Sequence, residues 1–249
     1  MKIVAIIPAR FNSQRLPAKI LADICGKSMI ERVYLQVQKS KLVTEIFVAT
    51  DDERIAETVK NFGGKFIMTP PELESGSDRI AFASKNIEAD IIVNVQGDEP
   101  LINPAMIDQT IKILIEDNSA EVSSAVKKIL KSEEIFNPNI VKVAIDNFNY
   151  GIYFSRSPIP FLRNEPNQNE WLKNAIFYKH FGIYVYRKNA LLKFTKFEKS
   201  ELEKMEMLEQ LRFLSNGIKI KIAITEFDSV AVDTIEDLEK VRKIILSQN

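Results

Sequence analysis

The chain has 249 residues, 45% of them hydrophobic, enough to bury a full core in one larger domain or in one domain with an appended lobe. Its 34 basic and 34 acidic side chains cancel, so no global field attracts nucleic acid or a membrane surface, and any positive site must be local. The single cysteine, Cys25, excludes an internal disulfide. No signal peptide or bilayer-spanning apolar stretch is found, so a cytoplasmic protein is expected.

Short runs rich in Val and Ile alternate with helical patterns through the first half of the chain. These runs are continuously apolar, which is typical of strands covered on both faces. The pattern predicts an α/β fold with a mainly parallel central sheet. The expected strands are residues 3–7, 46–49, 65–68 and 91–95, and apolar stripes for two helices run from Ile30 to Val37 and from Ile55 to Phe62.

The pattern changes at about residue 136. Closely spaced strand-like runs at residues 140–145, 150–155 and 181–186 predict a smaller antiparallel lobe, about 136–190, within a single domain of residues 1–249. Its polar loop, residues 158–174, is either mobile or covers a partner surface. The chain then returns to α/β order, with a helix at 208–216, a strand at 218–224, and a last helix that begins at Thr234, which forms a capping-box-like pair with Asp237.

A polar loop with three cations, Arg10, Arg15 and Lys19, follows the first strand. Ligands of α/β sheets bind beyond the carboxyl ends of the strands, so this loop is well placed to neutralise a phosphate chain. A solvated charged loop is the alternative. Neither a Walker A motif nor a GxGxxG sequence is present, which disfavours a P-loop NTPase and a dinucleotide dehydrogenase.

Two carboxylates stand at expected strand ends. Asp98 follows the strand at 91–95, on a turn where Gly97 permits close approach, and Asp233 precedes the last helix. Mg²⁺ prefers oxygen ligands shared between a few carboxylates and substrate phosphates, so the two aspartates are a candidate magnesium site. Each alone is as well explained as a turn or helix-start residue.

Together these residues resemble a known family, the CMP-KDO synthetases (3-deoxy-manno-octulosonate cytidylyltransferases). The resemblance spans nearly the whole chain, in the family's order. Its blocks are IPAR at 7–10, RLPAK at 15–19, ATDDER at 49–54, SGSDR at 75–79, NVQGDEP at 94–100, YFSR at 153–156, HFGIY at 180–184, LEQLR at 208–212 and VDT at 232–234.

The resemblance implies a GT-A-like, Rossmann-like nucleotidyltransferase, usually a homodimer formed through the antiparallel lobe. Such an enzyme transfers CMP from CTP to the anomeric hydroxyl of the sugar acid KDO, for lipopolysaccharide assembly. The residues implied to be catalytic are Lys19, Arg10 and Asp98; those that bind the nucleotide are Ala9, Arg10, Arg15, Lys19, Ser75, Arg79 and Gln96; those that line the sugar site are Arg163, His180, Tyr184, Glu209 and Gln210; and the Mg²⁺ ligands are Asp98 and Asp233.

Several alternatives stay open. Lys179 stands where many members have Arg, and some relatives with such a Tyr-Lys-His run are thought to use the 8-amino analogue of KDO. If the HFGIY block at 180–184 is set aside, His180 is better explained as a structural histidine than as a sugar ligand. A CMP-sialate synthetase and, in another class, a receiver-like binding module are the rival functions. Ala18 replaces a common glycine, which predicts an ordinary negative φ there.

Overall fold

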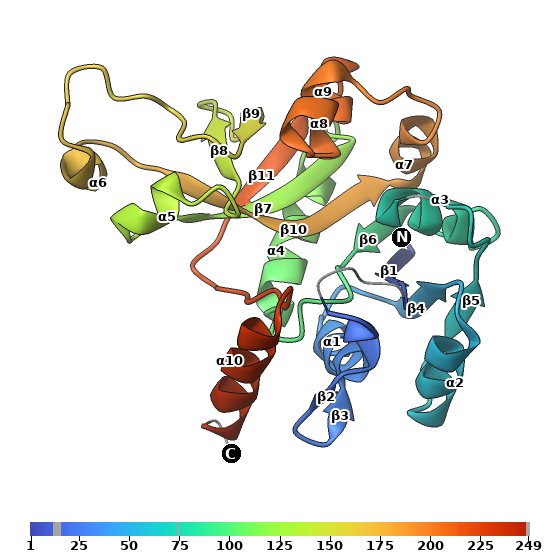
Figure 1. Cartoon of the computed structure of the whole chain (residues 1–249). Helices are drawn as coiled ribbons and strands as arrows, with labels where there is room; N and C mark the ends of the chain where they lie inside the picture. The colour runs from blue at the N-terminus through green and yellow to red at the C-terminus, as the bar shows by residue number, and fades with distance from the viewer. Residues whose placement is uncertain (12–15, 74, 248–249) are drawn as a thin grey trace.

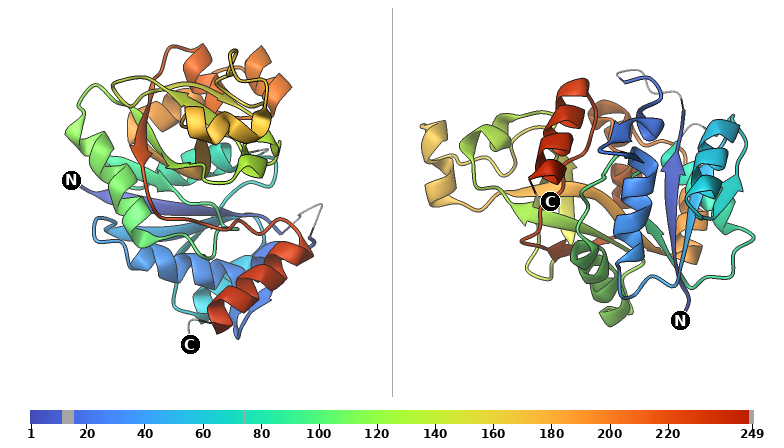
Figure 2. Two further views of the ribbon diagram at one scale, coloured as in Figure 1. Left: turned by 90° about the vertical axis from the view of Figure 1, so that its left-hand side faces the viewer. Right: turned by 90° about the horizontal axis from the view of Figure 1, so that it is seen from below.

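The computed structural model describes residues 1–11, 16–73 and 75–247 (Figure 1). A mixed central sheet runs in the order β11-β7-β10-β6-β1-β4-β5 and carries helices on both faces (Figure 2). The predicted α/β class is confirmed. The strands of this sheet are β1 (Ile3–Ala9), β4 (Glu45–Thr50), β5 (Phe66–Met68), β6 (Ile91–Asn94), β7 (Val122–Lys128), β10 (Tyr178–Arg187) and β11 (Ile220–Ile224).

β1 is the centre of the parallel part of the sheet. It pairs in parallel with β4 on one side and β6 on the other, and β5 pairs in parallel with β4. All seven residues of β1 are buried. Because successive side chains point to opposite faces, Ile7 enters one core and Ile6 the other, which explains the continuously apolar sequence.

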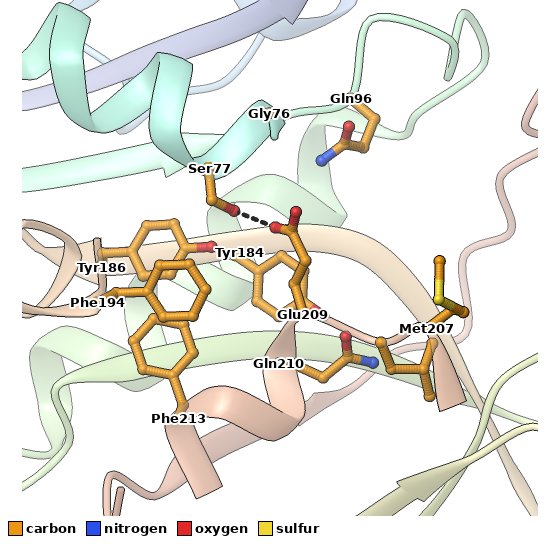
Figure 3. Close-up of a pocket in the computed structure, with 11 residues that line it drawn as sticks. Gly76, Ser77, Gln96, Tyr184, Tyr186, Phe194, Met207, Glu209, Gln210 and Phe213 are labelled. Carbon is orange, nitrogen blue, oxygen red and sulfur yellow. Dashed lines mark hydrogen bonds between the residues drawn. The ribbon is translucent and has the colours of Figure 1, made fainter. Parts of the chain in front are cut away.

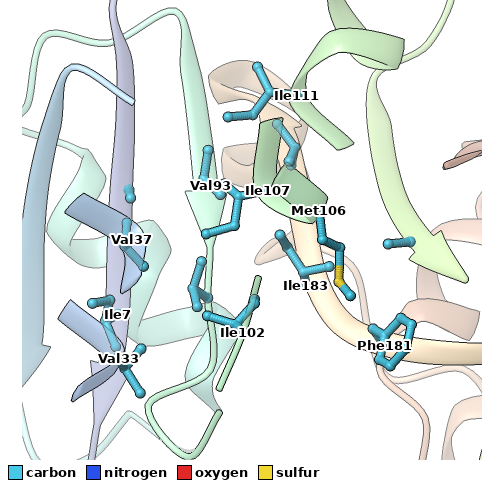
Figure 4. Close-up of a cluster of buried hydrophobic side chains, with 14 of the residues drawn as sticks. Ile7, Val33, Val37, Val93, Ile102, Met106, Ile107, Ile111, Phe181 and Ile183 are labelled. Carbon is cyan, nitrogen blue, oxygen red and sulfur yellow. The ribbon is translucent and has the colours of Figure 1, made fainter. Parts of the chain in front are cut away.

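Helices cover the two faces of the sheet and complete a three-layer architecture. Apolar side chains on one face pack against α1 (Met29–Gln38), α2 (Glu53–Asn61) and α4 (Pro104–Glu116). Those on the other face pack against α3 (Gly76–Ser84), α7 (Lys188–Phe194) and α9 (Gln210–Ser215). In the first of these cores, Val33 of α1 and Ile107 of α4 converge on the sheet (Figure 4).

β10 is antiparallel to both of its neighbours, β6 and β7. The run at 181–186, expected in the antiparallel lobe, therefore lies in the middle of the central sheet. β8 (Lys142–Ile145) and β9 (Gly151–Ser155) form an antiparallel hairpin, which joins the sheet at Tyr178 and Lys179, the first two residues of β10 (Figure 1).

The loop expected at 158–174 contains a 3-10 turn, η2 (Gln168–Glu170), and α6 (Trp171–Asn174). Trp171 is buried with Phe177 and with Ile135 of α5 (Ser132–Phe136), and its indole N–H donates to the carbonyl of Glu165 at 2.9 Å. The tryptophan thus ties the loop to the protein's own core. None of the described helices is both long and apolar enough to span a membrane.

The last helix, α10 (Ile235–Leu246), returns to the first part of the chain. Its apolar residues pack on the small hairpin of β2 (Asp23–Ile24) and β3 (Lys27–Ser28). The expected capping box is present, because Thr234 and Asp237 each bond the other's backbone N–H. This docking places Asp233 beside Lys19 at the start of η1.

The expectation for Ala18 is wrong. Ala18 precedes η1 (Lys19–Leu21) and has φ 54° and ψ 24°, in the left-handed region. The backbone conformation of this loop is set by tertiary contacts, which the residue type at position 18 does not show. Tertiary contacts of Lys19, described below, together with the bond from the N–H of Leu21 to the carbonyl of Ala18 at 2.8 Å, hold the strained conformation.

We predict that Ala18→Gly raises the free energy of unfolding by up to about 1 kcal/mol, because glycine adopts this conformation without a steric penalty. Ala22, at the other end of η1, has φ −57°, so Ala22→Gly should instead lower it by roughly 0.5–1 kcal/mol. Chemical denaturation measures both. Equal destabilisation by the two changes would contradict the left-handed assignment.

Candidate active site

Three segments distant in sequence meet at the carboxyl ends of the central strands. The ammonium of Lys19 donates to Oδ2 of Asp98 at 2.6 Å and to Oδ1 of Asp233 at 3.1 Å. Since both bonds share one nitrogen, the two oxygens are at most about 5.7 Å apart. The backbone N–H of Val232 also donates to the carbonyl of Asp98 at 2.9 Å. The structure thus brings Asp98 and Asp233 together; their role as metal ligands stays a prediction.

The charges of this trio are mutually stabilising. Only 10% of the Lys19 side chain is exposed, so burial works against its charged form, but the two carboxylates outweigh burial and the pKa of Lys19 is raised. Within the described residues, no three His, Cys, Asp or Glu side chains gather in a metal-binding group. Any ion at this pair would need further ligands from its substrate or from water.

Glu99, the residue after Asp98, is buried beside Lys19, Asp98 and Asp233. The sequence did not predict a role for it. Its buried carboxylate accepts from the hydroxyl of Ser229 at 2.5 Å and from the N–H of Gly182. Burial raises the pKa of Glu99 to about 7, and the charge of Asp98 adds to this effect. Glu99 joins the Asp98 turn, β10 and the segment leading to Asp233. No sequence signal separates it from an ordinary exposed turn residue.

Gly97 allows the Asp98 turn to approach β1, as expected. A Cβ at this position would lie 2.8 Å from the carbonyl oxygen of Pro8. That contact is closer than packed atoms allow, so any larger residue would displace the turn.

Three of the residues expected to hold the nucleotide lie at the end of β1 and at the start of α3. Ala9 ends β1, and the guanidinium of the half-buried Arg10 donates to the carbonyl of Leu73 at 2.8 Å. Burial, with the nearby charge of Arg79, lowers the pKa of Arg10. Ser75 caps α3 by accepting from the N–H of Asp78 at 3.0 Å. Arg15 lies outside the described residues.

Arg79 is fully buried behind the rim formed by the carboxyl ends of the central strands. Its guanidinium donates to Asp51 at 2.7 Å and to Thr69, so it is fixed by the end of β4 and the loop after β5. Its Nε has no hydrogen-bond partner among the described residues. With its side chain 0% exposed, Arg79 is held behind the rim and not on its surface.

A cavity of about 220 Å³ opens beside the rim (Figure 3). Its wall brings together four residues that the sequence assigned to the nucleotide or the sugar. They come from three separate segments of the chain: Gln96, Tyr184, Glu209 and Gln210. Ser77 donates to Glu209 at 2.6 Å, and burial raises the pKa of Tyr184 well above its ordinary value. The other lining residues are Gly76 and Ser77, from the segment 75–79 expected near the nucleotide, and Tyr186, Phe194, Met207, Leu208 and Phe213.

His180 lies on the wall of a larger adjoining cavity of about 1230 Å³, which shares Met207 with the first. Its Nε2 is 2.8 Å from the hydroxyl of Ser124, which itself donates to the carbonyl of Ile183 at 2.7 Å. A hydroxyl has one hydrogen, so the imidazole must be the donor. The ring packs against Phe154 and Tyr184, and this desolvation lowers the pKa of His180 to about 3.

Two expected features of the sugar site look different in the structure. Arg163 is exposed in the loop before η2 and lines neither cavity, so the structure does not bring it together with Tyr184 and Glu209. Lys179 lies on the larger cavity but is paired with Glu134 at 2.8 Å and Asp228 at 3.4 Å.

Comparisons with known proteins agree on one family. The cytidylyltransferase family profile matches residues 4–220. A 3-deoxy-manno-octulosonate cytidylyltransferase of Geobacter sulfurreducens is 48% identical over 97% of this chain and 98% of its own length, and that of Chloroherpeton thalassium is 47% identical over 98% of each. The solved structure of CMP:2-keto-3-deoxy-manno-octonic acid synthetase complexed with CTP covers both chains fully, with 40% identity and a TM-score of 0.93. The chain belongs to the cytidylyltransferase family.

Proposed function

We propose that this protein transfers CMP from CTP to the anomeric hydroxyl of KDO, releasing pyrophosphate, for lipopolysaccharide assembly. The observation that carries the proposal is the meeting of a charged rim, Lys19 with Asp98 and Asp233, and a polar cavity that contains Tyr184 and Glu209. With a metal cation on the two carboxylates the rim would suit a triphosphate, and the hydroxyl, amide and carboxylate groups of the cavity suit a hydroxyl-rich sugar. Relatives about half identical over almost their full length are named for this reaction.

The chain's own residues contribute mainly position and charge. The sugar hydroxyl attacks the α-phosphorus in line, and pyrophosphate leaves. In this proposal Arg10, Arg15 and Lys19 hold the triphosphate, and Lys19 also neutralises charge that develops on the α-phosphate. Ser75, Arg79 and Gln96 help to recognise the cytidine. No covalent intermediate with the protein is required.

Asp98 and Asp233 fit a magnesium ion in their donor chemistry. Both carboxylates already converge on one positive charge, the ammonium of Lys19, and Mg²⁺ is commonly held by one or two carboxylates together with substrate phosphates. Bound there, Mg²⁺ would supply positive charge to the triphosphate and Lewis acidity to the attacking hydroxyl.

The sugar-side assignments are proposals as well. Tyr184, Glu209 and Gln210 bind the acceptor from the smaller cavity, and His180 makes an uncharged contact from the larger one. The lone pair of its Nδ1 can accept a hydroxyl hydrogen, because Nε2 is committed to Ser124. Arg163 can join them only if its loop or a second chain brings it closer.

We also infer a homodimer through the lobe of residues 136–190, in a cytoplasmic setting. Exposed apolar side chains on and near the hairpin support the interface, among them Ile152 at 61% and Phe161 at 74% exposure. The single unpaired Cys25 suits a reducing compartment.

Substrate identity is tested by pyrophosphate release with CTP, Mg²⁺ and three acceptors: KDO, its 8-amino analogue and sialic acid. We expect release with KDO, with its 8-amino analogue or with both, and none with sialic acid, since relatives about half identical over almost their full length are named for KDO. Release with sialic acid alone would contradict the assignment. Omission of Mg²⁺ is the control for metal dependence.

The uncharged role of His180 is tested by NMR titration of its ring. His180 is the only histidine, so its signals can be followed alone. With the folded pKa near 3, the ring should stay neutral from about pH 5 to 8, whereas the chain unfolded in urea should titrate near 6.5. Because the folded pKa is below the unfolded one, stability should also fall as pH drops below about 6.5. A folded-state midpoint near 6.5 would contradict this.

A further inference from the structure

The turn between α8 (Glu201–Glu206) and α9 supplies part of the cavity wall (Figure 3). It contains Met207, a non-glycine residue with φ 52°, followed by Leu208 and Glu209. A left-handed conformation at such a residue persists only where the surroundings fix it. The wall that carries Glu209 and Gln210 is therefore held by contacts outside the turn itself.

One such contact joins the two helices. The guanidinium of Arg212 in α9 donates through two nitrogens to the carboxylate of Glu203 in α8, with Nε to Oε2 at 2.7 Å, and both side chains are buried. A paired fork of this kind fixes relative orientation. It sets α8 against α9 but does not tie the turn to the β8–β9 hairpin.

Glu206, the last residue of α8, makes that connection. Its Oε1 accepts from the hydroxyl of Ser155 at 2.6 Å, and its Oε2 accepts from the N–H of Arg156 at 2.9 Å. Burial and the nearby charge of Glu206 raise the pKa of the Tyr153 hydroxyl. Tyr153 and Ser155 lie two apart on β9, so they share one face of the strand.

The contact also runs in the other direction. Nε of Arg156 donates to the carbonyl of Glu206 at 2.8 Å, immediately before the left-handed residue. The carboxylate and the backbone carbonyl of Glu206 are therefore both fixed to the end of β9. Met207, with its left-handed conformation, follows directly in the chain. The hairpin in turn pairs with the start of β10, the strand that carries His180 and Tyr184.

We propose that Glu206 is a positioning residue for the acceptor sugar. By tying the α8–α9 turn to β9, it sets the depth at which Glu209 and Gln210 reach into the cavity opposite Tyr184. The inference rests on the proposed function for the identity of the acceptor. It does not place Glu206 in contact with the substrate, because Glu206 does not line the cavity.

Glu206→Gln is the informative change because it keeps the shape of the side chain. Two donors converge on the Glu206 carboxylate, and the N–H of Arg156 can act only as a donor. An amide offers one acceptor oxygen, which the Arg156 N–H would take, so the Ser155 hydroxyl would have to turn round and accept from the NH₂ group, and both charge-assisted bonds would be lost. The matched control is Glu201→Gln, which makes the same change in the same helix at an exposed residue that pairs with Lys204.

The first test separates the two substrates kinetically. Glu206→Gln should raise the KM for whichever ulosonic acid the wild type uses by about tenfold or more, because a displaced wall misplaces the acceptor. The KM for CTP should stay within about twofold, and Glu201→Gln should change neither. Adding Ser155→Ala to Glu206→Gln should have less than the multiplied effect, since both remove one contact. Equal rises in both KM values, or no rise, would overturn the proposal.

The second test needs no turnover. Hydrogen exchange at the backbone amides of residues 207–210 should be faster in Glu206→Gln than in the wild type, and unchanged in Glu201→Gln. Unchanged exchange in Glu206→Gln would overturn the positioning role even if no acceptor were found. A wild type inactive with every ulosonic acid would instead reject the proposed function, so the two failures are distinct.

Discussion

The ammonium of Lys19, held between the carboxylates of Asp98 and Asp233, is the interaction on which the site depends. It gathers the loop after β1, the turn after β6 and the approach to α10 at one point. Two carboxylates this close repel each other unless a positive charge lies between them. The need for that charge explains why the chain accepts a strained conformation at Ala18, directly before Lys19. It also explains why the two carboxylates suit a metal cation.

The topology of the sheet places the proposed nucleotide and sugar sites side by side. β6 carries the chain to Gln96 and Asp98, and β10 is its antiparallel neighbour, with Tyr184 directly opposite Asn94. The rim and the cavity therefore lie on adjacent strands of one rigid sheet. Such an arrangement favours catalysis by positioning, since little has to move for the two reactants to meet.

Local patterns predicted the parallel strands, because both faces of these strands are buried, and the stripe of α1, because one face of that helix buries a periodic apolar set. The capping box of α10 was predicted from the spacing of Thr234 and Asp237. Local patterns did not predict β7, whose buried Ser123 and Ser124 donate to the carbonyls of Thr110 and Ile183. A buried hydroxyl and an exposed one look alike in sequence. Family blocks predicted Tyr184 and Glu209 in the cavity, whereas Glu99 and Glu206 act through distant partners that no local pattern names.

Asp98 and Asp233 are proposed to bind the same metal cation. Mn²⁺, a spectroscopic substitute for Mg²⁺, can be titrated by electron paramagnetic resonance into the protein with CTP present, in the wild type, Asp98→Asn, Asp233→Asn and the double variant. If one ion is shared, either change should weaken the same binding step, and the combined effect should differ from the sum of the single effects, as expected for contacting residues. Independent losses that add, or binding unchanged in both single variants, would contradict the account.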